Sequence, residues 1–379
     1  MRCTPEMARR LIGIAWALAV MVHGVAAVAC PFCGVVGRSL AEQRDAADVT
    51  AVGESAGPVA RDDLGRLVQP FVVGQSLRGR GPAGDVVTAR VAGPIAGTAI
   101  LFRDPAGWEA VAADEPLLAH VALAPATTEP AARRLAWYAA RLEHRDPAIA
   151  ADAFTEFGNA PFAAVRDAAG AFDAEQLRQW IEEPGIDQRR RGFYGLALGL
   201  VAAATPAGAD RERHLAVLRR AVEAPGSDLR AGFDGLLAGI VVARGAAGVD
   251  ELVARGLLDG STRAGDARHA LAVLRFAGEN LGGSVPRDRV AAATARLLAS
   301  PAVAADAAVD LARYQEWSAI EAVAGLWDRL GRDDPLVRRA VAGYLAACPL
   351  PAARIQLDRL RAADPAGVGA ALEAALGPR

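Results

Sequence analysis

Residues 334–338 (DPLVR) carry the pattern that decides the fold of the larger, C-terminal part of this 379-residue chain. Asp serves there as a helix N-cap, and Pro occupies the first helical turn, where its missing N–H costs nothing. Related units begin at Asp146 (DPAIA), Ser300 (SPAVA) and Asp364 (DPAGV), with weaker versions near Ile186, Ser227 and Gly265. The pattern predicts helix starts near residues 147, 186, 227, 265, 302, 335 and 365, a recurrence of about 30–40 residues that is typical of stacked helix pairs.

The unit at residues 334–340 (DPLVRRA) resembles the helix-start signature of HEAT repeats. This resemblance implies paired helices over residues 131–379 that stack into an array. The concave face of such an array would offer an extended surface to another protein. Ala-rich helices in an irregular α–α bundle give similar spacing, so both helical arrangements stay open.

Residues 47–124 show a strand pattern instead of a helical one. Short segments rich in β-branched residues alternate with Gly- and Pro-containing turn signals. The predicted strands are 48–54, 67–77, 85–92, 99–103 and 118–123, and residues 124–130 (APATTEP) form a polar linker to the helices. Five short strands predict a small antiparallel barrel or sandwich. The predicted fold class is therefore α+β, with a small OB-like β-barrel followed by a HEAT-like helical array or an α–α bundle.

The N-terminus has the organisation of a secretory signal peptide over residues 1–29. Three Arg residues precede an apolar core at residues 11–22, and residues 27–29 (AVA) supply a small-x-small cleavage site. Cleavage after Ala29 would make Cys30 the first mature residue. We therefore expect an exported protein, periplasmic or secreted, because the apolar core is short for a transmembrane helix. An uncleaved N-terminal anchor and lipid modification of Cys30 are the alternatives.

Cys30 and Cys33 form a C-P-F-C motif in the N-terminal segment 30–46. An exported Cys pair is most often a structural disulfide. A redox pair, a metal site and a lipidated Cys30 are the other interpretations, although no second Cys pair or close His completes a zinc site. No cofactor is predicted. Cys348, near the end of a predicted helix, is most simply a buried apolar residue.

In the same segment, cysteines at the mature start are followed by residues 39–43 (SLAEQ), and residues 47–49 (ADV) run into a strand that ends at Gly53. This order resembles the opening of netrin-like (TIMP-type) domains. The resemblance implies a five-stranded OB-type barrel. Two departures, C-x-x-C in place of C-x-C and the lack of cysteine in residues 50–125, mean that the family's disulfide staple and protease inhibition are not carried over.

Two further motifs match catalytic or nucleotide-binding signatures outside their usual context. Residues 53–57 (GESAG) match the esterase motif G-x-S-x-G around Ser55, but a nucleophile elbow needs a parallel strand before it and a helix after it. Four histidines could equally be nominated as the base: His120, His144, His214 and His269. Residues 79–84 (GRGPAG) match G-x-G-x-x-G, yet a strand follows them, which predicts a hairpin loop.

All 42 basic residues are arginine, and the formal net charge is −2. The lack of lysine excludes P-loop and Schiff-base chemistry, and the charge does not indicate nucleic-acid binding. Arg189, Arg190 and Arg191 precede Phe193 and Tyr194 and form the candidate binding patch. The alternative is a helix start whose arginines pair with the acidic doublet at residues 182–183, with both aromatic rings in the core.

Together these patterns predict an exported, non-enzymatic binding or scaffolding protein that uses its helical surface to hold another protein. The second hypothesis is an exported thiol-disulfide or metal-binding protein that acts through Cys30 and Cys33. An esterase acting through Ser55 ranks third.

Overall fold

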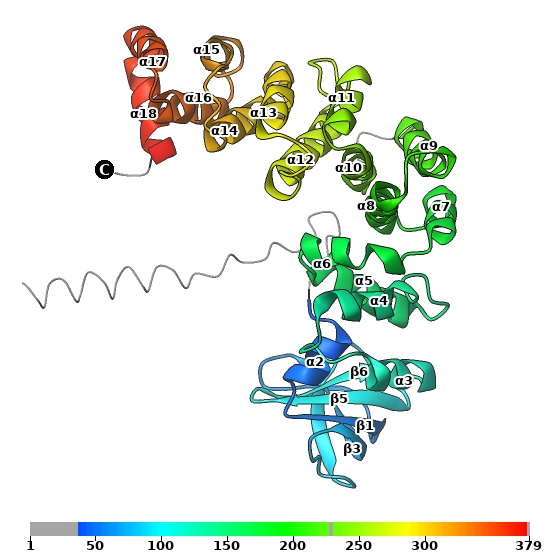
Figure 1. Ribbon diagram of the computed structural model, residues 1–379. Coiled ribbons are helices and arrows are strands. Elements are labelled where there is room, and N and C mark those ends of the chain that lie inside the picture. The colour runs from blue at the N-terminus through cyan, green and yellow to red at the C-terminus, as the bar shows by residue number, and fades with distance from the viewer. Residues whose placement is uncertain (1–36, 227–229, 377–379) are drawn as a thin grey trace, which may run out of the picture.

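The computed structural model describes residues 37–226 and 230–376. A small β-barrel forms one end of the molecule, and the helices leave it as a curved arc (Figure 1). The predicted α+β class, a barrel followed by a helical array, is confirmed. The predicted signal peptide and the pair Cys30 and Cys33 lie outside the described residues.

Five strands of the described chain close the barrel. They pair in the circuit β1–β3–β4–β6–β5–β1, in which only the β4–β6 pair is parallel. The strands are β1 (Val49–Ser55), β3 (Leu67–Arg78), β4 (Val86–Arg90), β5 (Thr98–Asp104) and β6 (Gly107–Ala112), with the two-residue β2 (Ala60–Arg61) on the edge of β3. Phe71, Val73 and Leu101 are buried inside. Alternate residues therefore fill a small barrel core, as expected for an OB-like barrel.

The predicted strand at residues 118–123 is wrong, because this segment belongs to helix α3 (Glu115–Leu123). The Asp114 side chain caps that helix by accepting a hydrogen bond from Leu117 N, at 3.0 Å. Leu117 and Val121, four residues apart, are both buried against the outside of the barrel. The fifth strand is instead β6, which follows β5 through the tight turn at residues 104–107.

The glycine-rich loop at residues 79–84 joins β3 to β4, so the predicted hairpin loop is confirmed. Gly79 has a φ of +69°, which favours glycine. A Cβ atom there would also overlap the carbonyl oxygen of Asp48. The backbone of this loop thus passes close to the backbone at Asp48. The loop does not lead into a helix whose N-terminus could bind a phosphate.

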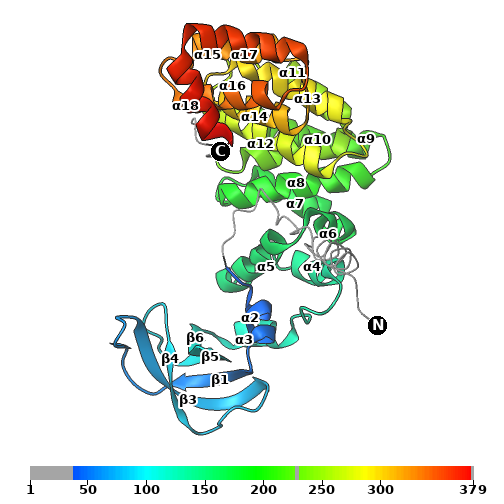
Figure 2. The same ribbon diagram turned by 90° about the vertical axis from the view of Figure 1, so that its left-hand side faces the viewer.

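From residue 174 onward the helices alternate between two layers. The outer layer holds α7 (Ala174–Glu182), α9 (Ala209–Glu223), α11 (Ala246–Ala254), α13 (Arg287–Arg296), α15 (Ile320–Arg329) and α17 (Pro351–Ala363). The inner layer holds α8 (Gln188–Ala204), α10 (Phe233–Arg244), α12 (Ala264–Asn280), α14 (Ala304–Arg313), α16 (Pro335–Ala347) and α18 (Pro365–Leu376). The inner helices line the concave side of the arc in Figure 1, and Figure 2 looks onto that side. The array is therefore built from helix pairs.

The helix starts predicted near residues 186, 227, 265, 302, 335 and 365 fall at or near the starts of inner helices, and residue 147 is the start of α5 (Pro147–Asn159). Asp146, Asp334 and Asp364 act as predicted, since each carboxylate accepts a hydrogen bond of 2.8 Å from a backbone N–H in the first turn. Ser300 does not, because it ends the short 3₁₀ segment η2 (Leu297–Ala299) and α14 begins only at Ala304. The spacing of the sequence pattern therefore corresponds to the inner helix of each pair.

Helices α8 and α10 touch backbone to backbone. Gly192 of α8 lies against Gly235 of α10, Gly195 and Gly199 lie against Gly239, and a Cβ atom on Gly195 would lie 2.8 Å from Leu236 Cα. Such an approach is possible only because these positions lack side chains. The backbones of the two helices thus lie in direct contact in the first half of the array.

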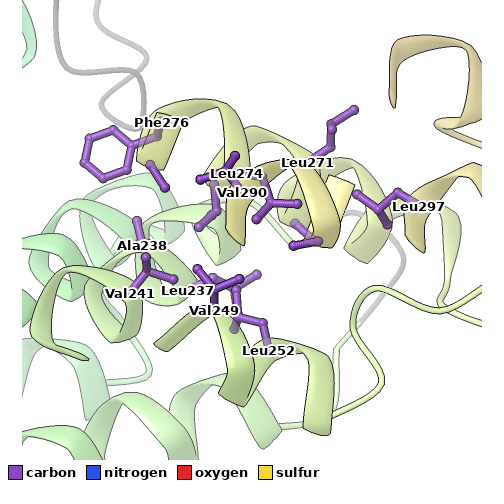
Figure 3. Packing of buried hydrophobic residues seen from close by; sticks show 14 of the residues in the cluster. Leu237, Ala238, Val241, Val249, Leu252, Leu271, Leu274, Phe276, Val290 and Leu297 are labelled. Atoms are coloured by element: carbon purple, nitrogen blue, oxygen red, sulfur yellow. The ribbon is translucent and has the colours of Figure 1, made fainter. Parts of the chain in front are cut away.

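Farther along the array, aliphatic side chains fill the space between helices. Leu237 and Val241 of α10, Val249 of α11, Leu274 of α12 and Val290 of α13 converge in Figure 3. Each of these side chains is fully buried. Each helix therefore depends on its neighbours for burial of its apolar face, as in other helical-repeat arrays.

Three helices connect the barrel to this array: α4 (Ala131–Ala139), α5 (Pro147–Asn159) and α6 (Phe162–Asp167). Leu135 and Tyr138 of α4 are fully buried, and so is Leu142 in the turn that follows. Phe154 of α5 packs edge-on against Phe193 of α8, with ring centroids 5.7 Å apart. Helix α5 therefore packs directly against α8, the first inner helix of the array.

Candidate functional site

The three arginines of the predicted patch lie in the first turn of α8 but diverge. Arg189 is exposed, whereas Arg190 Nη1 lies 3.3 Å from Glu143 Oε1. Arg191 Nη2 donates to the carbonyl oxygen of Glu183, at 2.6 Å. The alternative interpretation holds for Phe193 and Tyr194, which are fully buried. The ion pairs that this interpretation expected between residues 189–191 and the acidic doublet do not form. The Glu182 carboxylate is paired with Arg220, and Glu183 accepts a hydrogen bond from Arg191 through its backbone carbonyl.

Arg191 belongs to a recurring structural device. Arg230 Nη2 donates to Val222 O at the end of α9, and Arg338 Nε donates to Gly331 O just after α15. In each case an arginine near the start of an inner helix caps the end of the preceding outer helix. Such carbonyls lack partners within their own helix, and a cation is favourable beside them. Part of the arginine content therefore has a structural role in the turns.

A cleft of about 490 Å³ opens between the α7–α8 and α9–α10 turns. We call it the arginine cleft. Its charged lining consists of Arg191, Arg220, Arg230 and Glu182, so that three positive charges face one negative charge. Its apolar walls include Ile181, Ala221, Phe233 and Leu236. A positive cleft with apolar walls can take an anion that carries an aliphatic portion.

A second hollow, the inner groove, lies between α14, α16 and α18 on the concave side and measures about 430 Å³. Val309 is 43% exposed and Leu336 is 64% exposed within it. Asp306 and Arg339 also line this groove. Apolar side chains thus reach solvent from the inner helices, which is a common feature of protein-binding surfaces.

A buried polar cluster, the junction cluster, lies where α2 (Leu40–Ala46) and α3 meet α5. It consists of Ser39, His120, Arg134, Asp152 and Glu156. Nε2 of His120 lies 2.8 Å from Asp152 Oδ2, and Asp152 Oδ1 accepts a hydrogen bond from the backbone N–H that follows Ser39, at 2.6 Å. The Ser39 hydroxyl donates to Glu156, whose other carboxylate oxygen lies 2.8 Å from Arg134 Nη2.

The junction cluster has the residue types of a hydrolase but a closed arrangement. Ser39 donates to Glu156, and His120 is bonded to Asp152, so serine and histidine have separate partners. All four of these residues are buried, and other residues line the arginine cleft and the inner groove. The cluster therefore serves to hold α2 and the adjoining barrel against the helices.

Ser55, the candidate esterase nucleophile, is the last residue of β1, and antiparallel strands flank it. Its hydroxyl accepts a hydrogen bond from Gln69 Nε2, at 2.7 Å. The nominated bases His144, His214 and His269 contact Asp146, Arg178 and Asp234 respectively. In the described chain none of the four histidines is a hydrogen-bond partner of Ser55.

Cys348 is a buried free thiol near the end of α16. Over residues 37–226 and 230–376, no group of three or more His, Cys, Asp or Glu side chains is arranged to hold a metal ion. No helix in that part of the chain is long and apolar enough to cross a membrane.

No sequence pattern indicated the junction cluster, the arginine cleft or the inner groove. One local signal was present, because residues 39–42 (SLAE) form a capping box in which Ser39 and Glu42 each bond the other's backbone N–H. That motif locates the start of α2 but says nothing of Glu156, which is 117 residues away. The hollows are likewise formed by segments distant in sequence.

The chain was also compared with known proteins. No family model matches it. No curated protein and no solved structure gives a significant match either. A functional assignment for this chain therefore depends on its fold and its surfaces, and the netrin-like and HEAT-like resemblances stay predictions.

Proposed function

We propose that this protein is an exported, non-enzymatic binding or scaffolding protein whose helical array holds another protein on its concave side. The observation that supports the proposal is the inner groove, where Val309 and Leu336 expose apolar side chains. A helix partner or an extended segment that covered them would gain about 1.5–3 kcal/mol for each side chain fully buried. The barrel, held by the junction cluster, would form a fixed end of the scaffold.

The shape of the array supports the same proposal. Inner helices line the concave side (Figure 2), and α14, α16 and α18 pack in succession against one another there. Rigid curved arrays of this kind bind partners through extended contacts made by several repeats. A partner would therefore contact α14, α16 and α18 together.

The test uses a double variant of the full chain, Val309→Asp with Leu336→Asp. Its control is Leu350→Asp with Ile355→Asp, which introduces the same two charges at the N-cap and in the body of outer helix α17, where the residues are 45% and 68% exposed. After chemical cross-linking in the exporting cell, we expect one partner set for wild type and for the control, and its loss from the double variant. Capture of the same proteins by all three chains would overturn the proposal.

Export is tested separately. N-terminal sequencing of exported material should begin at Cys30, as the predicted cleavage site requires. A start at Met1 would remove the argument for an oxidising compartment.

The C-P-F-C motif at residues 30–33 supports a second proposal, a thiol-disulfide or metal-binding protein. A thiol titration distinguishes the two proposals. A readily reduced pair with a depressed thiol pKa would favour the second, and a stable disulfide would favour the scaffold.

A further inference from the structure

The inner groove lies between rows of small side chains on three inner helices. These rows are formed by Ala305 and Ala312 of α14, Ala340 and Gly343 of α16, and Ala375 of α18. The larger apolar side chains of Val309 and Leu336 reach solvent beside them. In folded proteins, a ridge of side chains on one helix packs into the groove between such rows on other helices. The shape of the inner groove therefore suits a helix.

The backbone chemistry of the groove also favours a helix over an extended segment. The interior of a helix pairs its own N–H and C=O groups, so α14 and α16 present no row of free backbone groups of the kind found at a sheet edge. Of the polar side chains in the lining, Tyr344 is already engaged, because its hydroxyl donates to the carbonyl oxygen of Glu316, at 2.7 Å. An extended segment would lose water from its backbone groups there without gaining partners, which is costly. A helix brings its backbone groups already paired.

The two charged side chains in the lining of the groove differ in how they are paired. Asp306 Oδ1 lies 3.4 Å from Nη2 of Arg275, on the neighbouring inner helix α12. Arg339 is exposed, and no carboxylate of the described residues forms an ion pair with it. Arg339 can therefore accept a carboxylate from an incoming partner, whereas Asp306 already has a cation beside it.

We infer that the inner groove takes an acidic, amphipathic helix of the partner protein. Apolar side chains from successive turns of that helix lie against Val309 and Leu336, and one of its carboxylates lies beside Arg339. The inference rests on the proposed function, since the same groove holds the partner, and it deepens that proposal by naming the secondary structure and the charge that the groove selects.

The probe is a fluorescein-labelled peptide of three heptads that carries leucine on one helix face and glutamate and alanine elsewhere. Its binding to the full chain is measured by fluorescence polarisation. The reference peptide has a proline in the middle heptad, which prevents a continuous helix. We expect the wild type to bind the helical peptide at least about tenfold more tightly than the proline peptide, because the cost of a proline inside a helix exceeds the free energy of a tenfold change in affinity.

The apolar contact is tested with the groove double variant, Val309→Asp with Leu336→Asp. It should weaken binding of the helical peptide at least about tenfold, because two apolar contacts are lost. The matched control is Leu350→Asp with Ile355→Asp, which places the same charges on outer helix α17 and should bind the peptide as the wild type does.

The charge contact is tested with Arg339→Gln. This change should weaken binding of the helical peptide about threefold, as expected for an exposed ion pair, and should not weaken binding of the same peptide with lysine in place of glutamate. The matched control is Arg354→Gln, which removes an exposed arginine of α17 that does not line the groove. Its affinity for both peptides should equal that of the wild type.

Equal binding of the helical and proline peptides, equal losses in a variant and its control, or no binding of the helical peptide would each overturn the inference. Such a failure leaves the proposed function standing if the cross-linked partner set still depends on Val309 and Leu336. Loss of that dependence would overturn the proposed function itself.

Discussion

The two halves of the helical array pack their inner helices against one another in different ways. In the first half, α8 and α10 meet through glycines, and residues 192–200 of α8 are buried without exception. In the second half, α14 and α16 pack through larger side chains and leave Val309 and Leu336 exposed on the concave side. The difference indicates a closely packed, rigid first half near the barrel and a second half whose concave surface leaves apolar side chains open to solvent.

Buried acidic groups show the same contrast. Glu251, on outer helix α11, accepts hydrogen bonds from Arg219, Arg244 and Arg255, and these arginines outweigh its burial and lower its pKa to about 2. Asp310, on inner helix α14, is fully buried. Burial raises the pKa of Asp310, although the neighbouring Arg275 opposes that shift. The carboxylate of Glu251 is thus well compensated by its three arginines, whereas that of Asp310 is compensated less completely.

The largest expected effect is that of Phe154→Ala, at the entry to the rigid half. Phe154 contacts Phe193, and its loss should cost roughly 3–5 kcal/mol of unfolding free energy through lost transfer energy and the cavity. Urea denaturation measures this cost, and limited proteolysis should release a β-fragment that ends near residues 124–130. Leu123→Ala, at a residue that is 72% exposed, is the control. Loss of barrel and helices in one transition would show instead that they share a core.

Gly239→Ala tests the glycine contact directly. A Cβ atom there would overlap the Gly195 carbonyl oxygen, and we expect a net loss of about 2 kcal/mol, since overpacking outweighs the gain in helix propensity. Gly325→Ala is the matched control, because it lies inside α15 with open space around it. That change should stabilise by about 0.5–1 kcal/mol. Thermal unfolding of both variants measures the difference, and equal shifts would contradict the account of α8 and α10.

The pH dependence of stability tests the arginine cluster around Glu251. Its pKa is lowered from the ordinary 4.5 to about 2, so its ionised form stabilises the fold above pH 4.5 and this contribution is lost as pH falls from 4.5 toward 2. Glu251→Gln should cost about 1–2 kcal/mol at pH 7, after allowance for solvent screening, and much less near pH 2. Urea midpoints at pH 7, 4 and 3 measure this, with the exposed Glu321→Gln as control. A cost that is independent of pH would rule out the ionic origin.

The smallest expected effect on stability is that of the groove double variant, Val309→Asp with Leu336→Asp. Val309 is 43% and Leu336 is 64% exposed to solvent, so the change should remove little buried apolar area and cost only about 1 kcal/mol, mostly through helix propensity. Urea denaturation checks this. A cost above about 3 kcal/mol would mean that these residues belong to the core, and the contrast between the two halves would disappear.

Sequence patterns predicted the barrel, the helix pairs and three of the N-caps, because each is specified by neighbouring residues. The strand predicted at residues 118–123 failed because a short apolar segment fits a strand and a helix equally well, while the cap at Asp114 and the spacing of Leu117 and Val121 favour a helix. Glycines at 195, 199, 235 and 239 are visible in the sequence, but their mutual contact depends on how α8 and α10 cross.

The candidate sites were less accessible to prediction than the fold. Arg191 was singled out, but its cleft partners Arg220 and Arg230 come from other turns of the array. The inner groove depends on which face of α14 and α16 the neighbouring helices leave uncovered. Such relations are tertiary, and no local pattern encodes them.

Site-specific photo-cross-linking tests the central claim most directly, that a partner protein binds the concave side at the inner groove. A benzophenone amino acid is introduced at Val309 in one chain and at Ile355 in another, and both are irradiated in the exporting cell. The account predicts a discrete adduct with one partner from position 309 and none from position 355, which lies on the outer layer. Adducts of equal yield at both positions, or adducts at position 355 alone, would contradict it.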